Sequence, residues 1–350
     1  MICIVRRKAF DCMAANTNLH KAKNAKNDEF YTQLTDVAKE LMHYKHHFKD
    51  KIVFCNCDDP TWSAFWKYFH LNFEALGLKK LISTHYDKTE PTYKMEYTGG
   101  DDNDIEVGVK TPLEGNGDFR NKECLDLLDE ANIVVTNPPF SLAREYLACL
   151  VEHGKKFLIV GDMNWITYKE VFPLLKSNSI WLGNCSVKEF VQPDGTIKKF
   201  GNKLWFTNLD HEKRHEKLIL WKNYTPEEYP HYDNYDAINV DKVDQIPCDY
   251  DGVMGVPITY LDKHNPDQFE ILGYTGGLGW NEQNDVQTTK EYVDAKQHNP
   301  DGSITSGGKV NTGAALRYDS IPADRYYSAS NVNGYLLRTY GRILIRRKDA

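Results

Sequence analysis

The chain has 350 residues, of which 41% are hydrophobic, 27% charged and 12% aromatic, and its formal net charge is −7. This composition predicts an ordinary globular protein with a sizeable core, and it excludes a disordered chain or a protein that binds polyanions indiscriminately. No apolar run approaches the roughly 18 residues that a membrane-spanning helix needs, and the first residues are too short for a secretory leader, so we expect a cytoplasmic protein without a membrane partner.

Regular elements begin after a polar entry segment. Residues 1–27 are rich in Lys and Asn and predict a flexible, basic arm. Apolar residues at helical spacing then predict a first helix between Asp28 and Phe48. Short apolar runs alternate with helical stretches after it, and they predict strands at 52–55, 80–84, 133–136 and 157–160 and helices at 61–76 and 141–153.

The alternation of apolar strands with helices predicts an α/β fold. Strands that are apolar throughout are typical of a parallel sheet with helices on both faces. Ligands bind such sheets at the carboxyl ends of the strands, so a site is expected in the segments that follow these strands. Cys55 and Cys57 would point to opposite faces of one strand, which argues against a disulfide or a zinc site there, and we expect no metal.

The pattern changes after residue 180 to short strands separated by turns. Residues 273–313 are rich in Gly, Ser and Thr and are typical of long loops. The chain ends in an alternating basic strand at Tyr340–Arg347. We therefore divide the chain into the arm 1–27, a core 28–180 and a mixed region 181–350, of which 273–340 is expected to be rich in loops.

Chemistry is indicated by the string Asn137-Pro138-Pro139-Phe140, which directly follows one predicted strand and precedes a helix. The side-chain carbonyl of Asn137 and the backbone carbonyl of Pro138, held by two consecutive prolines, form a fixed pair of acceptors. Such a pair would localise the lone pair of a planar amino group such as N6 of adenine, and Phe140 would stack on a base flipped out of a duplex. If a sulfonium compound then donates a methyl group to this nitrogen, no general base is required, because the sulfonium is a strong electrophile and the proton can leave after the transfer. The alternative is that Pro138-Pro139 merely ends a strand, but its place at the expected ligand edge favours the catalytic interpretation.

The sequence resembles the EcoRI-type adenine-specific DNA methyltransferases. The resemblance extends over about residues 18–272 and the Arg342–Ile345 ending, and it is carried by the stretches 28–33, 54–60, 117–120, 133–140, 165–172, 232–240 and 251–259. It implies a Rossmann-type methyltransferase domain that uses S-adenosylmethionine, releases S-adenosylhomocysteine and acts on double-stranded DNA, with a C-terminal target-recognition region in 181–350.

The resemblance also implies individual cofactor contacts. Phe30, Tyr31 and Thr32 correspond to the motif that closes over the methionine end of the cofactor. Asp118 and Phe119 correspond to the motif that contacts its adenine, where a carboxylate and a ring make physical sense.

The loop after the first strand departs from the glycine-rich pattern usual in methyltransferases, which lets backbone approach the cofactor. It reads Cys55-Asn56-Cys57-Asp58-Asp59. At least one of Asp58 and Asp59 is expected to contact the cofactor, with a helix N-cap as the alternative. Tyr86 and Asp87 follow the second strand, where an acidic residue commonly holds ribose hydroxyls.

Candidate phosphate-binding cations are interleaved with aromatic residues in the second half of the chain. They are Lys188, Lys198, Lys203 and Arg214, and the arm adds Lys23 and Lys26. A solvated charged face, or for the arm a disordered tail, is the alternative. We expect a monomer, and the resemblance allows a cognate restriction endonuclease that acts on the same site without a stable complex.

Two other functions are open from the sequence alone. One is methylation of an RNA base or of a protein glutamine, although enzymes of these kinds usually have a glycine-rich first loop and lack a large C-terminal region. The other is a DNA-binding relative that has lost catalysis, for which the unusual first loop is the only support.

Overall fold

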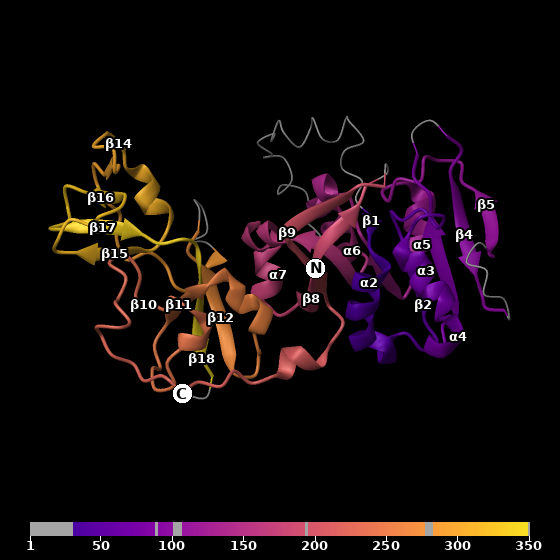
Figure 1. The fold of residues 1–350 in the computed structure, drawn as a ribbon, viewed down its shortest axis with the longest axis horizontal. Coiled ribbons are helices and arrows are strands. Elements are labelled where there is room, and N and C mark those ends of the chain that lie inside the picture. Colours follow the sequence, from indigo (N-terminus) through magenta and orange to yellow (C-terminus); the bar gives the residue numbers. More distant parts are fainter. Residues whose placement is uncertain (1–30, 88–89, 101–106, 193–194, 277–282, 349–350) are drawn as a thin grey trace, which may run out of the picture. The chain divides into compact units, whose positions relative to one another are not determined.

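The computed structural model describes residues 31–87, 90–100, 107–192, 195–276 and 283–348 (Figure 1). The chain divides into two compact units, one made of residues 1–162 and 186–203 and the other of residues 163–185 and 204–350. The exchange of chain between them lies in a long hairpin, β8 (Trp181–Val191) and β9 (Ile197–Thr207), whose tip belongs to the first unit. The first unit therefore includes residues from beyond position 180, because residues 186–203 of this hairpin of two 11-residue strands belong to it.

A nine-stranded mixed sheet forms the centre of the first unit, in the order β1-β8-β9-β7-β6-β2-β3-β4-β5. Its other strands are β1 (Tyr31–Thr32), β2 (Ile52–Cys55), β3 (Lys80–Thr84), β4 (Tyr93–Tyr97), β5 (Val109–Pro112), β6 (Ile133–Thr136) and β7 (Lys156–Asp162). Strands β7, β6, β2 and β3 are parallel, whereas β4 and β5 pair antiparallel at one edge and β1 pairs antiparallel with β8. The predicted parallel sheet is confirmed, and all residues of β2 and β6 are buried, as their continuous apolar sequences predict.

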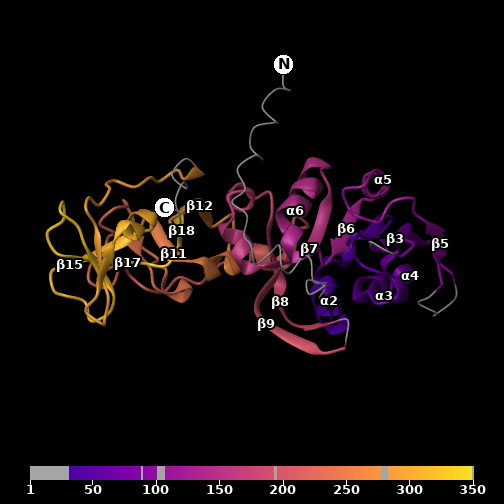
Figure 2. The ribbon, with the colours of Figure 1, turned by 90° about the horizontal axis from the view of Figure 1, so that it is seen from above.

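Helices cover both faces of these parallel strands. They are α2 (Leu34–Leu41), α3 (Ala64–Leu71), α4 (Phe73–Leu76), α5 (Lys122–Glu130) and α6 (Ala143–Glu152). Figure 2 shows α5 and α6 on one side of the strands and α2, α3 and α4 on the other. Right-handed crossovers dictate this arrangement, since β2 leads through α3 to β3 in one direction and β6 leads through α6 to β7 in the other.

All three helices predicted in the core are shorter than the sequence pattern suggests. The one predicted between Asp28 and Phe48 is α-helical only over Leu34–Leu41 and continues as a 3₁₀ helix at Met42–His47. The helix predicted from Thr61 begins only after Ser63, whose hydroxyl accepts hydrogen bonds from the backbone N–H groups of Phe65 and Trp66 at 3.1 and 3.2 Å. The helix predicted from Ser141 begins at Ala143, because a 3₁₀ turn at Phe140–Leu142 comes first. Both shifts lengthen the loops at the carboxyl ends of β2 and β6.

The second unit contains α7 (Phe172–Lys176) and two smaller sheets. One has the order β10-β11-β18-β12, with β10 (Ile238–Asn239), β11 (Met254–Pro257), β12 (Phe269–Tyr274) and β18 (Arg342–Arg347). The other has the order β14-β13-β16-β17-β15, with β13 (Lys296–His298), β14 (Ile304–Ser306), β15 (Ala315–Tyr318), β16 (Tyr326–Ser328) and β17 (Tyr335–Arg338). The basic strand predicted at the end of the chain is confirmed as β18.

The segment 273–313, predicted to form long loops, contains β13 and β14. These strands escape sequence analysis because they are three residues long, and Lys-Gln-His of β13 has no apolar alternation. They are held in a sheet whose small core comprises Tyr292, Val310, Ala315, Tyr327 and Leu336. Among the helices that the structure describes, none has the length and apolarity needed to cross a membrane.

Candidate active site

The loops that follow β2 and β6 meet at the carboxyl edge of the parallel strands. Asp58, in the loop after β2, is 8% exposed, and its Oδ2 accepts a hydrogen bond from the backbone N–H of Asn137 at 3.3 Å. The Thr136 hydroxyl contacts the same carboxyl oxygen and also the backbone carbonyl of Asn56. A buried carboxyl group therefore joins the first loop to the Asn-Pro-Pro-Phe loop.

The environment of Asp58 favours its neutral form. Burial raises the pKa of Asp58 to about 7, although hydrogen bonds from Thr136 and Asn137 act in the opposite direction. The Thr136 hydroxyl has one hydrogen but contacts two oxygens, on Asn56 and Asp58. Thr136 is the donor in both contacts, so its hydrogen is shared between the carbonyl of Asn56 and Oδ2 of Asp58. Burial is the largest of these effects, and it keeps Asp58 protonated at a pH well below 7.

The loop after β2 turns at Cys57, whose φ is +67°. Left-handed backbone is uncommon outside glycine, so this cysteine occupies a conformation that glycine adopts more readily. Asn56 supports the turn, since its side-chain oxygen accepts from the Cys57 N–H at 2.9 Å and from the Thr84 hydroxyl at 3.1 Å. Cys55 is buried, and burial raises the pKa of its thiol, which stays protonated. These residues shape the loop through hydrogen bonds in place of glycine.

Asp59 is directed toward the end of β3. Its Oδ2 lies 2.9 Å from Nδ1 of His85, and its Oδ1 accepts a hydrogen bond from the Tyr93 hydroxyl at 3.1 Å. The N-cap of α3 is supplied by Ser63 and not by Asp58 or Asp59, so the structure does not support a cap as the role of either aspartate.

Tyr86 and Asp87 lie where the chain leaves β3. Tyr86 is 38% exposed, and the backbone N–H of Asp87 donates to the carbonyl of Asn116 at 3.2 Å. Gly117 has a φ of +73°, and a Cβ at this position would lie 2.2 Å from the carbonyl oxygen of His85. Only glycine allows this close approach, which brings the following Asp-Phe motif to the end of β3.

Asp118 and Phe119 are tightly held. The Asp118 carboxylate forms a two-pronged ion pair with Arg120, with Nε–Oδ1 and Nη2–Oδ2 distances of 2.8 and 2.6 Å. Arg120 also donates to Glu145 at 2.9 Å. Phe119 is 3% exposed and meets Tyr146 edge-on at a centroid distance of 5.0 Å. Phe119 therefore belongs to the core, and the carboxylate of Asp118 is the part of this motif that remains suited to a ligand contact.

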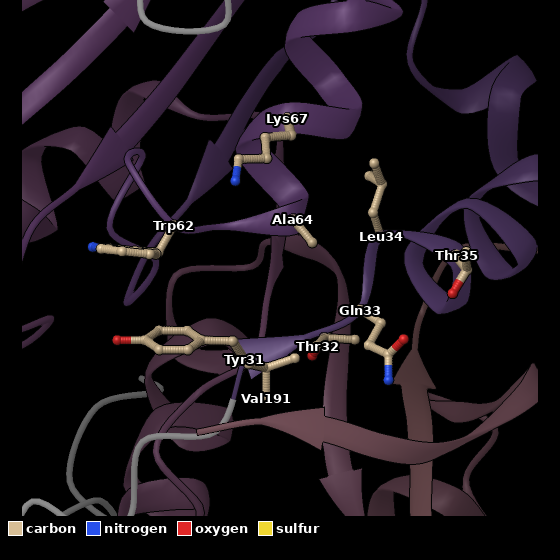
Figure 3. Close-up of a pocket in the computed structure, with 9 residues that line it drawn as sticks. All are labelled: Tyr31, Thr32, Gln33, Leu34, Thr35, Trp62, Ala64, Lys67 and Val191. Atoms are coloured by element: carbon tan, nitrogen blue, oxygen red, sulfur yellow. The ribbon is translucent and has the colours of Figure 1, made fainter. Parts of the chain in front are cut away.

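A pocket of about 370 Å³ lies between β1 and the start of α3. Figure 3 shows one side formed by Tyr31, Thr32 and Val191 and the opposite side by Trp62, Ala64 and Lys67. The Thr32 hydroxyl is buried and has no hydrogen-bond partner in the described part of the chain. Lys67 points its ammonium group from α3 toward this space. The lining combines apolar side chains with hydroxyl and amide groups and one cation, which suits a small ligand that carries an anionic group.

The half-buried ring of Phe140 lies among other aromatic rings. Phe190 meets it edge-on at a centroid distance of 6.1 Å, and Phe200 meets Phe190 in the same way at 5.5 Å. The Lys203 Nζ atom lies 4.0 Å from the centroid of Phe140. Lys203 is 5% exposed, so its placement does not suit a contact with a DNA phosphate.

The geometry agrees with comparisons of the chain with known proteins. The model of one protein family, described as adenine-specific methyltransferase EcoRI, matches residues 18–348. The chain belongs to this family. It is accordingly a DNA adenine methyltransferase of the restriction-modification type.

Individual relatives are similar over most of this methyltransferase. The type II methyltransferase M.EcoRI of Escherichia coli is 48% identical, in an alignment that covers 76% of this chain and 91% of the relative. The type II methyltransferase M.MpnI of Mycoplasma pneumoniae is 39% identical, with 72% and 84% covered. No solved structure matches the chain significantly.

The candidate DNA-binding cations of the methyltransferase fall into two groups. Lys188 on β8 and Lys198 on β9 are exposed. The Cζ atom of Arg214 lies 3.8 Å from the ring centroid of Trp181, and its Nη1 atom lies 3.4 Å from Oδ1 of Asp210. The side chain of Arg214, like that of Lys203, is largely buried. Trp205 and Phe206, two aromatic residues that follow Lys203 on β9, are fully buried. Phe30, Lys23 and Lys26 lie outside the described residues.

Several residues at the site are missed by the sequence analysis. They are Trp62 and Lys67 at the pocket, His85 at the end of β3, and Phe190 and Phe200 beside Phe140. The signal for Lys67 is its place one turn into the helix that follows the first loop, whereas the two Phe residues had no local signal. Within the described ranges, no three His, Cys, Asp or Glu side chains are arranged to hold a metal ion.

Proposed function

We propose that this methyltransferase transfers a methyl group from S-adenosylmethionine to N6 of an adenine extruded from double-stranded DNA. The observation that carries the proposal is the joining of the Asn137–Phe140 loop to the loop after β2 through Asp58, at the carboxyl edge where ligands of parallel sheets bind. The parallel strands and the two helical layers support a Rossmann-type catalytic domain.

The protein contributes to this reaction mainly by positioning the two substrates. The acceptor oxygens of Asn137 and Pro138 would receive hydrogen bonds from the two amino hydrogens of adenine, which localises the nitrogen lone pair. Pro138 is buried, and Pro139 fixes the conformation before it, so the backbone carbonyl keeps its direction. Phe140 would stack on the flipped base. S-adenosylmethionine supplies the electrophilic methyl group, and the amino proton leaves to solvent.

The pocket between β1 and α3 fits the methionine end of the donor. Its volume of about 370 Å³ lies within the range of roughly 300 to 1,000 Å³ usual for small-molecule pockets. Tyr31 would cover the ligand, the buried Thr32 hydroxyl would bond to it, and Lys67 would pair with its carboxylate.

We assign the nucleoside end of the donor to the ends of β2 and β3. The backbone of Cys55–Asp59 would line one side, and Tyr86 with Asp87 would lie near the ribose. The Asp118 carboxylate, oriented by Arg120, would accept a hydrogen bond from the cofactor adenine, while Phe119 would support this position from the core. S-adenosylhomocysteine would leave from the same place.

We assign target recognition to the C-terminal region and phosphate contacts to the exposed cations Lys188 and Lys198. A monomer suffices for this chemistry, because every proposed catalytic group lies in the first unit of one chain. A cognate endonuclease that shares the recognition sequence, without a stable complex, would be the partner in restriction and modification.

The test is a methyl-transfer assay with the full chain, tritiated S-adenosylmethionine and unmethylated duplex DNA, followed by sequencing that detects N6-methyladenine. We expect label at one adenine of a short recurring sequence, and we expect Asn137→Ala to lower the rate of labelling on the order of a hundredfold. Label found only in RNA or protein, or as methylcytosine, would refute the proposal.

A further inference from the structure

Lys203 is a buried cation packed against the catalytic ring. Its side chain, on β9, is 6% exposed, and Nζ lies 4.0 Å from the ring centroid of Phe140 and 4.9 Å from that of Phe200. Ammonium groups favour aromatic faces because the ring quadrupole is negative there, and the attraction grows when water is excluded. The cation therefore occupies one face of Phe140.

The carboxylate of Asp162 anchors this cation. Asp162 is the last residue of β7, and its Oδ2 lies 2.6 Å from Nζ of Lys203. The side-chain amide of Asn202 donates to both carboxylate oxygens of Asp162, at 3.0 and 2.9 Å. Since a carboxylate so bound has little freedom to rotate, the position of the ammonium group is fixed from the end of β7.

We propose that Lys203 is a positioning residue for methyl transfer, whose ammonium group, fixed by Asp162, sets the plane of the Phe140 ring on which the adenine stacks. The inference rests on the proposed function, in which the base stacks on Phe140. The cation takes one face of the ring and the adenine takes the opposite face, so a tilt of the ring would displace N6 from the acceptors of Asn137. A displacement of about 1 Å is enough to lower a rate on the order of a hundredfold.

The alternative is an ion pair that only stabilises the fold. Removing one partner of a buried pair leaves an uncompensated charge, so Lys203→Met alone could unfold the protein. The double variant Lys203→Met with Asp162→Asn removes both charges and retains an amide at position 162, and it keeps the test informative if the single variant does not fold.

The experiment is a double-mutant cycle with Phe140→Leu, which removes the ring but keeps an apolar side chain. The measured quantity is the single-turnover rate of methyl transfer to a duplex that carries the sequence found methylated above. We expect Lys203→Met/Asp162→Asn to lower the rate about tenfold, because losing part of the energy of a desolvated cation–ring contact corresponds to a rate change of this size. When Phe140 is already Leu, the same double variant should lower the rate less than threefold.

Two further measurements separate positioning from stability. The dissociation constant for S-adenosylmethionine should stay within about twofold, because Lys203 does not line the pocket assigned to the methionine end of the donor. With 2-aminopurine in place of the target adenine, its emission in the complex should shift toward that seen with Phe140→Leu. Lys80→Met is the matched control, since Lys80 pairs with Glu130 at 2.9 Å at the amino end of β3, the opposite edge of the sheet, and should leave the rate within twofold.

If the unaltered enzyme methylates DNA but the loss is the same with and without the Phe140 ring, Lys203 does not act through that ring and the inference is overturned alone. If the unaltered enzyme transfers no methyl group to DNA, the proposed function fails and the inference fails with it.

Discussion

The protonation of Asp58 gives the most specific prediction about the site. Burial raises the pKa of Asp58 to about 7, against about 3.9 for an aspartate in the unfolded chain. Between these values the folded protein binds a proton that the unfolded chain has released. The contribution of Asp58 to stability is therefore fully present at low pH and is lost as the pH rises toward 7.

The size of the effect follows from the pH interval. About two pH units separate pH 5 from a pKa of about 7, and each unit corresponds to about 1.4 kcal/mol, so this contribution should fall by about 3 kcal/mol between pH 5 and pH 8. Asp58→Asn cannot ionise and should not show this loss. The free energy of unfolding of the unaltered protein, minus that of Asp58→Asn, should thus be about 3 kcal/mol more favourable at pH 5 than at pH 8.

Urea denaturation at several pH values measures this difference. The matched control is Asp126→Asn, an aspartate whose side chain is 61% exposed and which pairs with Lys122 at the surface. Its difference from the unaltered protein should change by less than 1 kcal/mol over the same range. A difference for Asp58→Asn that is equally constant would show that Asp58 is ionised in the fold over this whole pH range, and it would contradict the raised pKa.

Further predictions concern the neighbouring loops and the pocket. Gly117→Ala should destabilise the protein by about 2 kcal/mol more than Gly154→Ala in thermal denaturation, because both have positive φ but only Gly117 faces a carbonyl at 2.2 Å from the added Cβ; equal losses would contradict the close approach. Lys67→Met should weaken S-adenosylmethionine binding about tenfold in calorimetry by removing an ion pair, and an unchanged affinity would remove Lys67 from the site. Asp118→Ala should also weaken S-adenosylmethionine binding, with a smaller effect on the rate at saturating cofactor. A lowered rate with unchanged cofactor affinity would contradict a contact between Asp118 and the cofactor. Asn137→Ala should lower the rate on the order of a hundredfold while the cofactor affinity stays within twofold, and equal losses of both would mean that the loop is only structural.

The sequence alone determined the central strands and the reactive loop. Ile52–Cys55 and Ile133–Thr136 are continuous apolar runs, and such runs are stable only when both faces of the strand are covered, so their place in a parallel sheet follows from burial. The Asn-Pro-Pro-Phe string carries its own geometry, because proline restricts the backbone wherever the chain goes. The family is likewise readable from local strings of residues, and the match over 18–348 confirms it.

Only the tertiary structure decided which distant side chains meet at that loop. Asp58 reaches Asn137 across 79 positions, and Lys203 reaches Asp162 across 41, and no local pattern predicts either contact. From the sequence, Lys203 is predicted to bind a DNA phosphate, because a cation near aromatic residues is typical of an exposed nucleic-acid-binding surface. In the folded chain the β8–β9 hairpin carries it inward, where Asp162 compensates its charge and Phe140 covers its ammonium group. Charge pairing across the sheet is a property of register and strand order, and these are fixed only when the whole sheet assembles.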